Sequence, residues 1–237
     1  MPRKPCLDGL ENFTPCVAKM SEKQKSIIYF VKYPEPRKVK TRLAKTVGFE
    51  KAARIYRGLA EANLRVLAST LTEGIRILIA FDPPEREIAF KKWLSSAHHY
   101  FPQRGEDLGS RLKNAFAYAF ETFGGDVIVA GSDTLGLRKD LILSAFNLLV
   151  KNTVVLGPAK DGGYYLVGLS AAAPNLFRDI PWSSSQVMEC TLQRVREQSL
   201  AYALLTELED LDEYEQKISN TIGDMHEWRR THETTSR

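Results

Sequence analysis

A short basic segment holds the whole excess of positive charge in this 237-residue chain. Residues 34–45 contain five basic side chains and one glutamate, a net charge of +4 that equals the net charge of the chain. Lys40 and Arg42 can both reach phosphate oxygens, and the planar guanidinium of Arg42 suits a bidentate contact. Charge gathered in one segment favours a small polyanion over nucleic acid, which needs basic residues spread over a face. A solvated basic loop would give the same pattern and stays an alternative.

An aspartate between two glycines could hold a metal. Residues 130–137 follow an apolar run, and Asp133 comes directly after it. Mg²⁺ prefers one or two carboxylates together with substrate phosphates, so Asp133 could bind Mg²⁺ or Mn²⁺ beside a nucleotide. If Asp133 lies unpaired near Asp161, the two carboxylates should repel each other until a cation arrives. The alternative is an aspartate that only shapes a turn.

Two further segments could face a ligand. In residues 105–112, Asp107 can cap a helix whose first N–H groups would bind an anion or the edge of a base. A plain helix cap with a solvated Arg111 also explains that segment, and this interpretation is favoured when the segment is considered alone. In residues 156–168, two glycines precede two tyrosines, so that the backbone could approach a ligand closely beside flat rings. A hairpin turn would explain the Asp-Gly pair there, but not the longer string.

Alternating strands and helices can bring these segments together. Apolar periodicity predicts strands near residues 26–31, 75–81, 98–101, 126–130, 153–156, 163–169 and 202–205. It predicts helices near residues 49–69, 85–94, 107–123, 139–150, 184–198 and 211–218. Such alternation indicates a three-layer α/β/α sandwich with a mostly parallel sheet, whose ligands bind at the carboxyl ends of the strands. We expect one domain over residues 25–222, a loosely ordered extension over 1–24 and a polar tail over 223–237.

The sequence lacks the motifs that are typical of several other classes of protein. Cys6, Cys16 and Cys190 form no close pair, which indicates free thiols in a reducing compartment. The segments contain neither a P-loop nor a G-x-G-x-x-G fingerprint, and the histidines show no metal-ligand spacing. The apolar runs are too short to span a membrane, and no apolar leader stands at the N-terminus. We therefore expect a cytoplasmic protein.

Taken in order, the motifs resemble those of a bacterial and archaeal family of transferases of unknown function. Residues 32–43 resemble K-x-P-x-P-G-x-V-K-T-R-L, 105–112 resemble G-x-D-L-G-x-R-L, and 157–169 match G-P-A-x-D-G-G-Y-Y-L-I-G-L over nearly their whole length. Residues 131–137 resemble G-S-D-x-P-x-L, 180–184 resemble I-x-W-S-T, and 210–212 resemble the start of D-I-D-T-P-E-D. Two departures are plain. Arg37 stands where the family has a glycine, a residue that permits positive φ, and Leu135 stands where the family has a proline.

The resemblance implies the nucleotide-diphospho-sugar transferase fold, also called GT-A and Rossmann-like, and assigns roles to residues. The residues implied to bind the nucleotide are Lys32, Lys40, Thr41, Arg42, Asp107, Gly109, Arg111 and Ser132. Those implied to bind the other substrate are Gly162, Gly163, Tyr164, Trp182 and Ser184. The catalytic residues would be Asp133, Asp161 and Lys40, and the metal ligands Asp133 and Asp212. Trp182 could equally be a core residue, and Asp212 a helix cap.

The function implied by the resemblance is a Mg²⁺- or Mn²⁺-dependent transferase acting on an activated nucleotide and a small-molecule acceptor. Glycosyl transfer from a nucleotide-diphospho-sugar is the first expectation. Nucleotidyl transfer from an NTP with release of pyrophosphate is the alternative, because the family is also similar to phospholactate and molybdopterin guanylyltransferases. The departures at Arg37 and Leu135 leave room for a third possibility, a non-catalytic nucleotide-binding regulatory protein.

Overall fold

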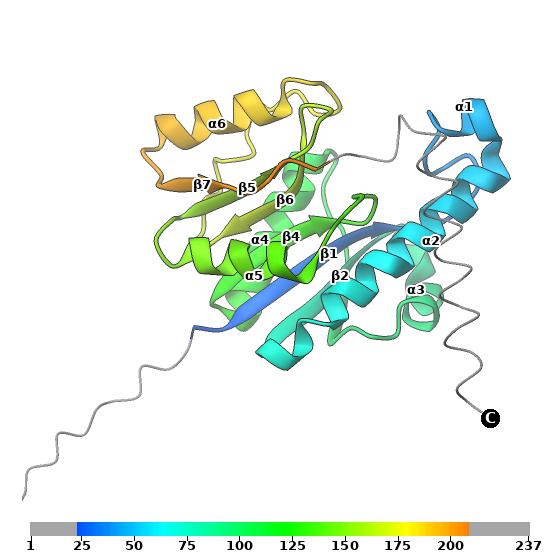
Figure 1. Cartoon of the computed structure of the whole chain (residues 1–237), viewed down its shortest axis with the longest axis horizontal. Coiled ribbons are helices and arrows are strands. Elements are labelled where there is room, and N and C mark those ends of the chain that lie inside the picture. The colour runs from blue at the N-terminus through cyan, green and yellow to red at the C-terminus, as the bar shows by residue number, and fades with distance from the viewer. Residues whose placement is uncertain (1–22, 209–237) are drawn as a thin grey trace, which may run out of the picture.

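The computed structural model describes residues 23–208, which form a central sheet between two layers of helices (Figure 1). The strands are Lys25–Lys32 (β1), Ile75–Asp82 (β2), His99–Pro102 (β3), Asp126–Gly131 (β4), Val154–Pro158 (β5), Tyr164–Leu169 (β6) and Tyr202–Leu204 (β7). Their order across the sheet is β3-β2-β1-β4-β6-β5-β7. The predicted three-layer α/β/α architecture is confirmed.

The helices cover both faces of the sheet. They are Ala44–Val47 (α1), Phe49–Ala68 (α2), Glu87–Trp93 (α3), Leu108–Phe123 (α4), Lys139–Leu149 (α5) and Val187–Glu197 (α6). One apolar core joins α2, α3 and α5 to one face, and Figure 1 shows α2 and α5 crossing that face. A second core joins α4 and α6 to the other face. Alternate residues of β1 serve the two cores: Ile27 and Tyr29 belong to the first and Ile28 to the second.

Strand direction departs from a fully parallel sheet at one place. β1 runs parallel to β2 and β4, β2 to β3, and β5 to β7. β6 runs antiparallel to both of its neighbours, β4 and β5. The turn from β5 to β6 therefore lies at the same edge of the sheet as the carboxyl ends of β1, β2 and β4. The prediction of a mostly parallel sheet is confirmed, and the reversed strand keeps the glycine-rich turn at that same edge.

Most predicted elements exist, with shifted ends. The helix expected over 85–94 is divided into a 3-10 turn, Pro84–Arg86, and α3, and the helix expected over 184–198 begins later, at Val187. The short helix α1 and the 3-10 turn Leu71–Glu73 were not predicted. The helix expected over 211–218 and the polar tail lie outside the described residues, as does nearly all of the N-terminal extension. Across residues 23–208, none of the helices combines the length and apolarity that a bilayer span requires.

Arg37 keeps a backbone conformation that suits glycine. Its φ is 70°, in the left-handed region, although an arginine side chain stands there. The guanidinium lies over the ring of Phe49, 5.2 Å from its centroid, where a cation–π interaction contributes about 0.5–1 kcal/mol at an exposed site. The loop that follows β1 therefore retains its positive φ despite the substitution, and the contact with Phe49 offsets part of the backbone strain.

Replacement of Arg37 by glycine and by alanine should separate these two terms. Both variants lose the contact with Phe49, but only glycine relieves the left-handed backbone, which costs an L-residue about 1–2 kcal/mol. Glycine also loses more entropy on folding, which offsets part of this gain. We therefore expect the unfolding free energy of Arg37→Gly to exceed that of Arg37→Ala by about 1 kcal/mol. Urea denaturation of the two variants measures the difference. Equal stability would contradict a strained φ at this position.

Candidate active site

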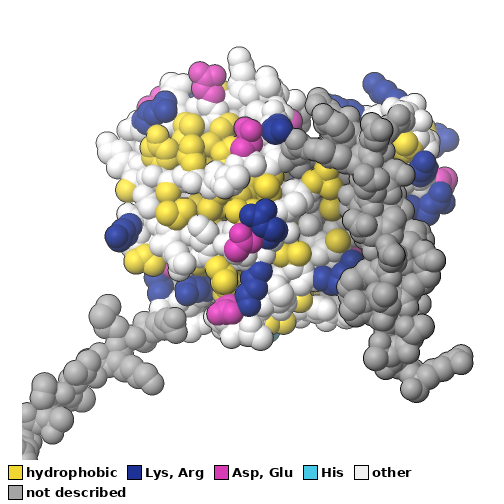
Figure 2. All heavy atoms as spheres, viewed as in Figure 1, with side chains coloured by type: hydrophobic (Ala, Val, Ile, Leu, Met, Phe, Trp, Pro, Cys, Tyr) yellow, Lys and Arg dark blue, Asp and Glu magenta, His cyan; other side chains and the backbone are white. Residues whose placement is uncertain are grey.

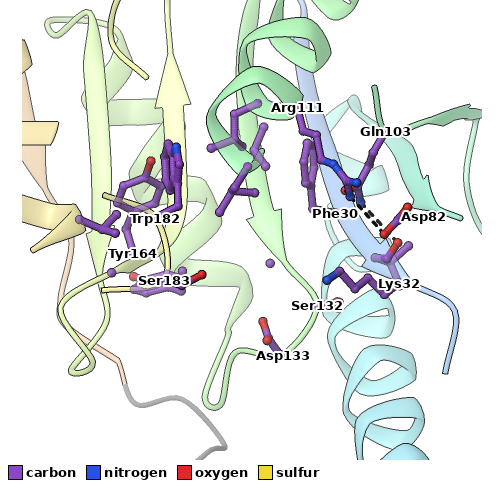
Figure 3. Close-up of a pocket in the computed structure, with 18 of the residues that line it drawn as sticks. Phe30, Lys32, Asp82, Gln103, Arg111, Ser132, Asp133, Tyr164, Trp182 and Ser183 are labelled. Carbon is purple, nitrogen blue, oxygen red and sulfur yellow. Dashed lines mark hydrogen bonds and ion pairs between the residues drawn. The ribbon is translucent and has the colours of Figure 1, made fainter. Parts of the chain in front are cut away.

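The polar loops meet around one cleft of about 990 Å³ at the carboxyl edge of the sheet. It is lined by residues of the loop after β1, the start of α4, the end of β4, the β5–β6 turn and the segment 182–185. In Figure 3, Trp182 and Tyr164 lie on one side of it, Arg111 and Asp82 on the other, and Asp133 lies below them in this view. The expected convergence of the four segments on one pocket is thus observed.

Lys40 and Asp133 form an ion pair inside this cleft. The Lys40 ammonium lies 3.0 Å from Oδ2 of Asp133. The lysine side chain is only 7% exposed, whereas the aspartate side chain is 47% exposed. Lys40 also has a left-handed backbone, with φ 46°. The sequence predicted an unpaired Asp133 repelled by Asp161, and this is wrong because Lys40 supplies the opposite charge.

Residues of α2 hold the loop that carries Asp133. The Tyr56 hydroxyl lies 2.8 Å from Oγ of Ser132, and the backbone N–H of Lys32 donates to the same hydroxyl over 2.9 Å. Asn63 donates from Nδ2 to the Thr134 carbonyl over 2.9 Å. Burial raises the pKa of Tyr56 far above its usual value, so its phenol stays protonated. These contacts fix β1, α2 and the β4 loop relative to one another, and Tyr56 and Asn63 were missed by the sequence analysis.

A second ion pair lies on the wall of the cleft that faces Tyr164 and Trp182 (Figure 3). Arg111 on α4 contacts Asp82 at the end of β2, with 3.1 Å between Nη1 and Oδ2, and its Nε donates to the Gly105 carbonyl over 3.0 Å. Gln103 donates from Nε2 to the Ala80 carbonyl over 2.9 Å, which turns its Oε1 towards Arg111, 3.4 Å away. Arg111 is therefore fixed rather than freely solvated. Asp82 and Gln103 were also missed, although Asp82 directly follows the strand predicted over 75–81.

The start of α4 combines a cap with close packing. Asp107 accepts from the Ser110 N–H over 2.7 Å, and Ser110 Oγ accepts from the Asp107 N–H over 3.1 Å, so the helix-cap interpretation is confirmed. These hydrogen bonds lower the pKa of the Asp107 carboxyl. Gly109 does not line the cleft. A Cβ there would come within 2.7 Å of the Phe177 carbonyl and of the Trp182 indole nitrogen, so glycine makes room for the segment that carries Trp182.

The β5–β6 turn is built in a similar way. Asp161 accepts from the Gly163 N–H over 2.8 Å, and its carboxylate, although it lines the cleft, also shapes the turn. Gly162 has φ 86°, and a Cβ there would lie 2.1 Å from the Ser185 carbonyl oxygen. The absence of a side chain at Gly162 thus lets the segment 182–185 approach, and Gly162 itself does not line the cleft.

Two aromatic rings and three serines form the wall next to this turn. Tyr164 and Trp182 pack edge to face, with centroids 6.3 Å apart. Trp182 both packs against the core beneath α4 and lines the cleft, so each of its two expected roles is compatible with its place. Ser184 donates to the Pro181 carbonyl over 2.7 Å and accepts from the Gln186 N–H over 3.2 Å, so its hydroxyl is used in the turn.

The structure brings most of the predicted site residues to one place. Those that line the cleft are Lys32, Lys40, Thr41, Arg42, Asp107, Arg111, Ser132, Asp133, Asp161, Gly163, Tyr164, Trp182 and Ser184. Gly109 and Gly162 lie packed behind them. Asp212 lies outside the described residues. Their roles in binding and catalysis stay predictions.

Asp133 fits a metal that arrives with its other ligands. Among residues 23–208, no group of three or more His, Cys, Asp or Glu side chains is arranged to hold a metal ion. Asp133 offers a single half-exposed carboxylate next to the basic loop. Mg²⁺ bound through one or two carboxylates and substrate phosphates matches this arrangement, whereas a protein cage of several carboxylates does not.

Comparison with known proteins places the chain in a family. Residues 66–184 match the profile of a family described as uncharacterized proteins conserved in bacteria (DUF2064). A candidate nucleotide-diphospho-sugar transferase from Desulfovibrio desulfuricans G20, solved by crystallography, is 36% identical, with a TM-score of 0.75. That match covers 81% of this chain and 83% of the relative.

More distant solved structures share the fold. CMP:2-keto-3-deoxy-manno-octonic acid synthetase complexed with CTP is 12% identical, with a TM-score of 0.51 over 86% of this chain and 99% of that one. The inositol-1-phosphate CTP transferase from T. maritima is 12% identical, with a TM-score of 0.52 over 84% and 95%. Among curated proteins, none matches this sequence significantly. The matched profile and the 36% identical relative together show that the chain belongs to the bacterial family DUF2064, with the fold of the nucleotide-diphospho-sugar transferases.

Proposed function

We propose that this protein is a transferase that uses an activated nucleotide together with Mg²⁺ or Mn²⁺, and specifically a nucleotide-diphospho-sugar transferase. The observation that carries the proposal is the meeting of Lys40, Arg42 and Asp133 in one cleft. Cationic side chains suit phosphates, and an adjacent carboxylate suits the cation that accompanies them. The name of the 36% identical relative agrees with this chemistry.

The two walls of the cleft differ in chemistry and suit different parts of the substrates. Asp82, Gln103 and Arg111 present fixed donors and acceptors, which suit the hydrogen-bonding groups of a nucleoside. Tyr164 and Trp182 present aromatic surface on the other side, which suits the face of a sugar or an acceptor. The volume of about 990 Å³ lies at the upper end of the range for ligand pockets, enough for two bound substrates.

The chemistry requires positioning and charge neutralisation more than a strong base. A divalent cation, when bound, would neutralise the phosphates of the leaving group. Arg42 and Lys40 would hold those phosphates, and the rigid loop around Ser132 would keep Asp133 in a fixed place. Preorganised charges of this kind usually make the largest contribution to catalysis, and positioning of the two substrates adds to it.

A nucleotidyltransferase that releases pyrophosphate is the second candidate. This fold also carries CTP-using transferases, two of which align with more than four fifths of the chain. Both chemistries would use the same phosphate-binding residues, so the products separate them: a nucleoside diphosphate from glycosyl transfer and pyrophosphate from nucleotidyl transfer. A regulatory protein would bind nucleotide and release neither product.

Thermal unfolding with a panel of NTPs and nucleotide-sugars, with and without Mg²⁺, tests the proposal. A ligand at 100 times its Kd should raise the unfolding free energy by about 2.7 kcal/mol. We expect at least one nucleotide to raise the Tm in a Mg²⁺-dependent manner. If no member of the panel changes the Tm under either condition, the cleft does not bind nucleotides and the proposal fails.

Arg42→Ala should weaken nucleotide binding with little effect on folding. A hydrogen bond to a charged group contributes about 1.5–3 kcal/mol, so the Kd should rise about 10- to 100-fold. Arg42 is exposed, and the unfolding free energy should change by no more than about 0.5 kcal/mol. Isothermal titration measures the affinity. Lys45→Ala is the matched control, because Lys45 is equally exposed, lies on α1 and does not line the cleft, and it should bind like wild type.

Asp133→Asn should abolish the dependence of nucleotide binding on Mg²⁺ and lower turnover by about 10²–10³-fold. The free protein loses the carboxylate that faces the largely buried Lys40 ammonium, and a buried donor that loses its partner costs about 1–3 kcal/mol, so the unfolding free energy should fall by that amount. Asp140→Asn is the control, since it removes an exposed ion pair with Arg138 away from the cleft. An Asp133→Asn variant that retains the Mg²⁺-dependent rise in Tm would exclude Asp133 as the metal ligand.

A further inference from the structure

The proposed function requires Lys40 and Asp133 to bind different parts of the substrate, although the two side chains already contact each other. Lys40 should bind phosphate and Asp133 should bind a cation, yet Nζ of Lys40 lies 3.0 Å from Oδ2 of Asp133. The other carboxylate oxygen, Oδ1, faces the backbone at Gly131, where a Cβ would lie 3.3 Å from it. While Lys40 stays in place, its ammonium cancels the charge of Asp133 and would repel a second cation at this carboxylate.

The lysine is the partner that can move. Asp133 lies between two residues that are held by hydrogen bonds. The Ser132 hydroxyl is hydrogen-bonded to Tyr56, and the Thr134 carbonyl accepts from Asn63. The Lys40 ammonium stands on a flexible four-carbon stem, and rotation about that stem can carry it several ångströms while the backbone stays still. The Lys40 carbonyl accepts from the Ala44 N–H over 2.9 Å, which anchors the backbone at the start of α1.

We propose that Lys40 is an internal counter-ion that exchanges partners when substrate binds. In the free protein it neutralises Asp133. When a metal-bound polyphosphate enters, Lys40 leaves the carboxylate for a phosphate oxygen, and Asp133 becomes free to contact the metal. One ion pair is replaced by two, so the exchange is favourable only when cation and phosphates arrive together. The cleft should therefore select the metal–nucleotide complex over free metal. This inference rests on the proposed function.

Binding of Mn²⁺ alone, measured by the electron paramagnetic resonance signal of the free ion, tests the first half of the exchange. Wild type should bind Mn²⁺ weakly. Lys40→Met removes the competing ammonium and should bind Mn²⁺ about tenfold more tightly, the factor expected for the loss of one charge-assisted contact of ordinary strength. Lys45→Met is the matched control and should bind like wild type. If Lys40→Met does not fold, Lys40→Gln, which retains a hydrogen-bonding group without the charge, gives the same comparison.

Titration of inorganic pyrophosphate in the presence of Mn²⁺ tests the second half and needs no knowledge of the base. Here the advantage of the variant should disappear or reverse: Lys40→Met should bind Mn²⁺–pyrophosphate no more tightly than wild type, because the lost contact between Lys40 and phosphate offsets the release of Asp133. A lysine that only holds the loop together would weaken both titrations, and that result would overturn the exchange. Equal affinity of wild type and variant for Mn²⁺ alone would also overturn it. If wild type fails to bind Mn²⁺–pyrophosphate, the proposed function itself fails.

Discussion

The parallel pairing of β1 with β2 and β4 decides where the polar segments of this protein lie. Parallel strands end at the same edge of a sheet, so the loop after β1, Asp82 at the end of β2 and the loop after β4 meet there without further instruction from the sequence. The antiparallel strand β6 completes the arrangement, because it makes the connection from β5 a tight turn at that same edge. Segments that are more than a hundred residues apart thus share one cleft.

Glycines next to the cleft act mainly by letting other segments approach. Gly109 leaves space for the Trp182 indole, and Gly162 leaves space for the backbone at Ser185. Both contacts press the segment 182–185 against the start of α4 and the β5–β6 turn, which gives the aromatic wall its position. A glycine-rich motif near a ligand site therefore has two physical uses, approach to the ligand and approach of one loop to another, and here the second is visible. On the face shown in Figure 2, basic and acidic side chains are interspersed.

The sequence predicted the layers, nearly all the elements and thirteen of the residues that line the cleft, because apolar periodicity and motif order are local signals. The direction of β6 could not be predicted, since a buried strand has the same apolar pattern in either direction. Tyr56, Asn63 and Gln103 were missed because they act from the middle of a helix or after a short strand, where a polar residue has no distinctive spacing. The Lys40–Asp133 pair joins loops 93 positions apart and depends on the side-chain reach of lysine, which no pattern encodes.

Four of the charged side chains around the cleft are paired with one another before any ligand enters. Lys40 pairs with Asp133, and Arg111 pairs with Asp82 on the wall opposite Tyr164 and Trp182, so the largely buried Lys40 ammonium has a counter-ion. Such pairing is expected of a stable fold, because an unpaired charge with little access to water is costly. The pairing also affects the free energy of ligand binding. A ligand that contacts Lys40 or Asp133 must replace this ion pair, and this part of its binding free energy is the difference between the new pairs and the old. A free phosphate or a free cation offers a replacement for one partner and strands the other. In the proposed exchange a metal-bound nucleotide would offer both at once, so selectivity for the complete substrate would follow from the ion pair of the free protein.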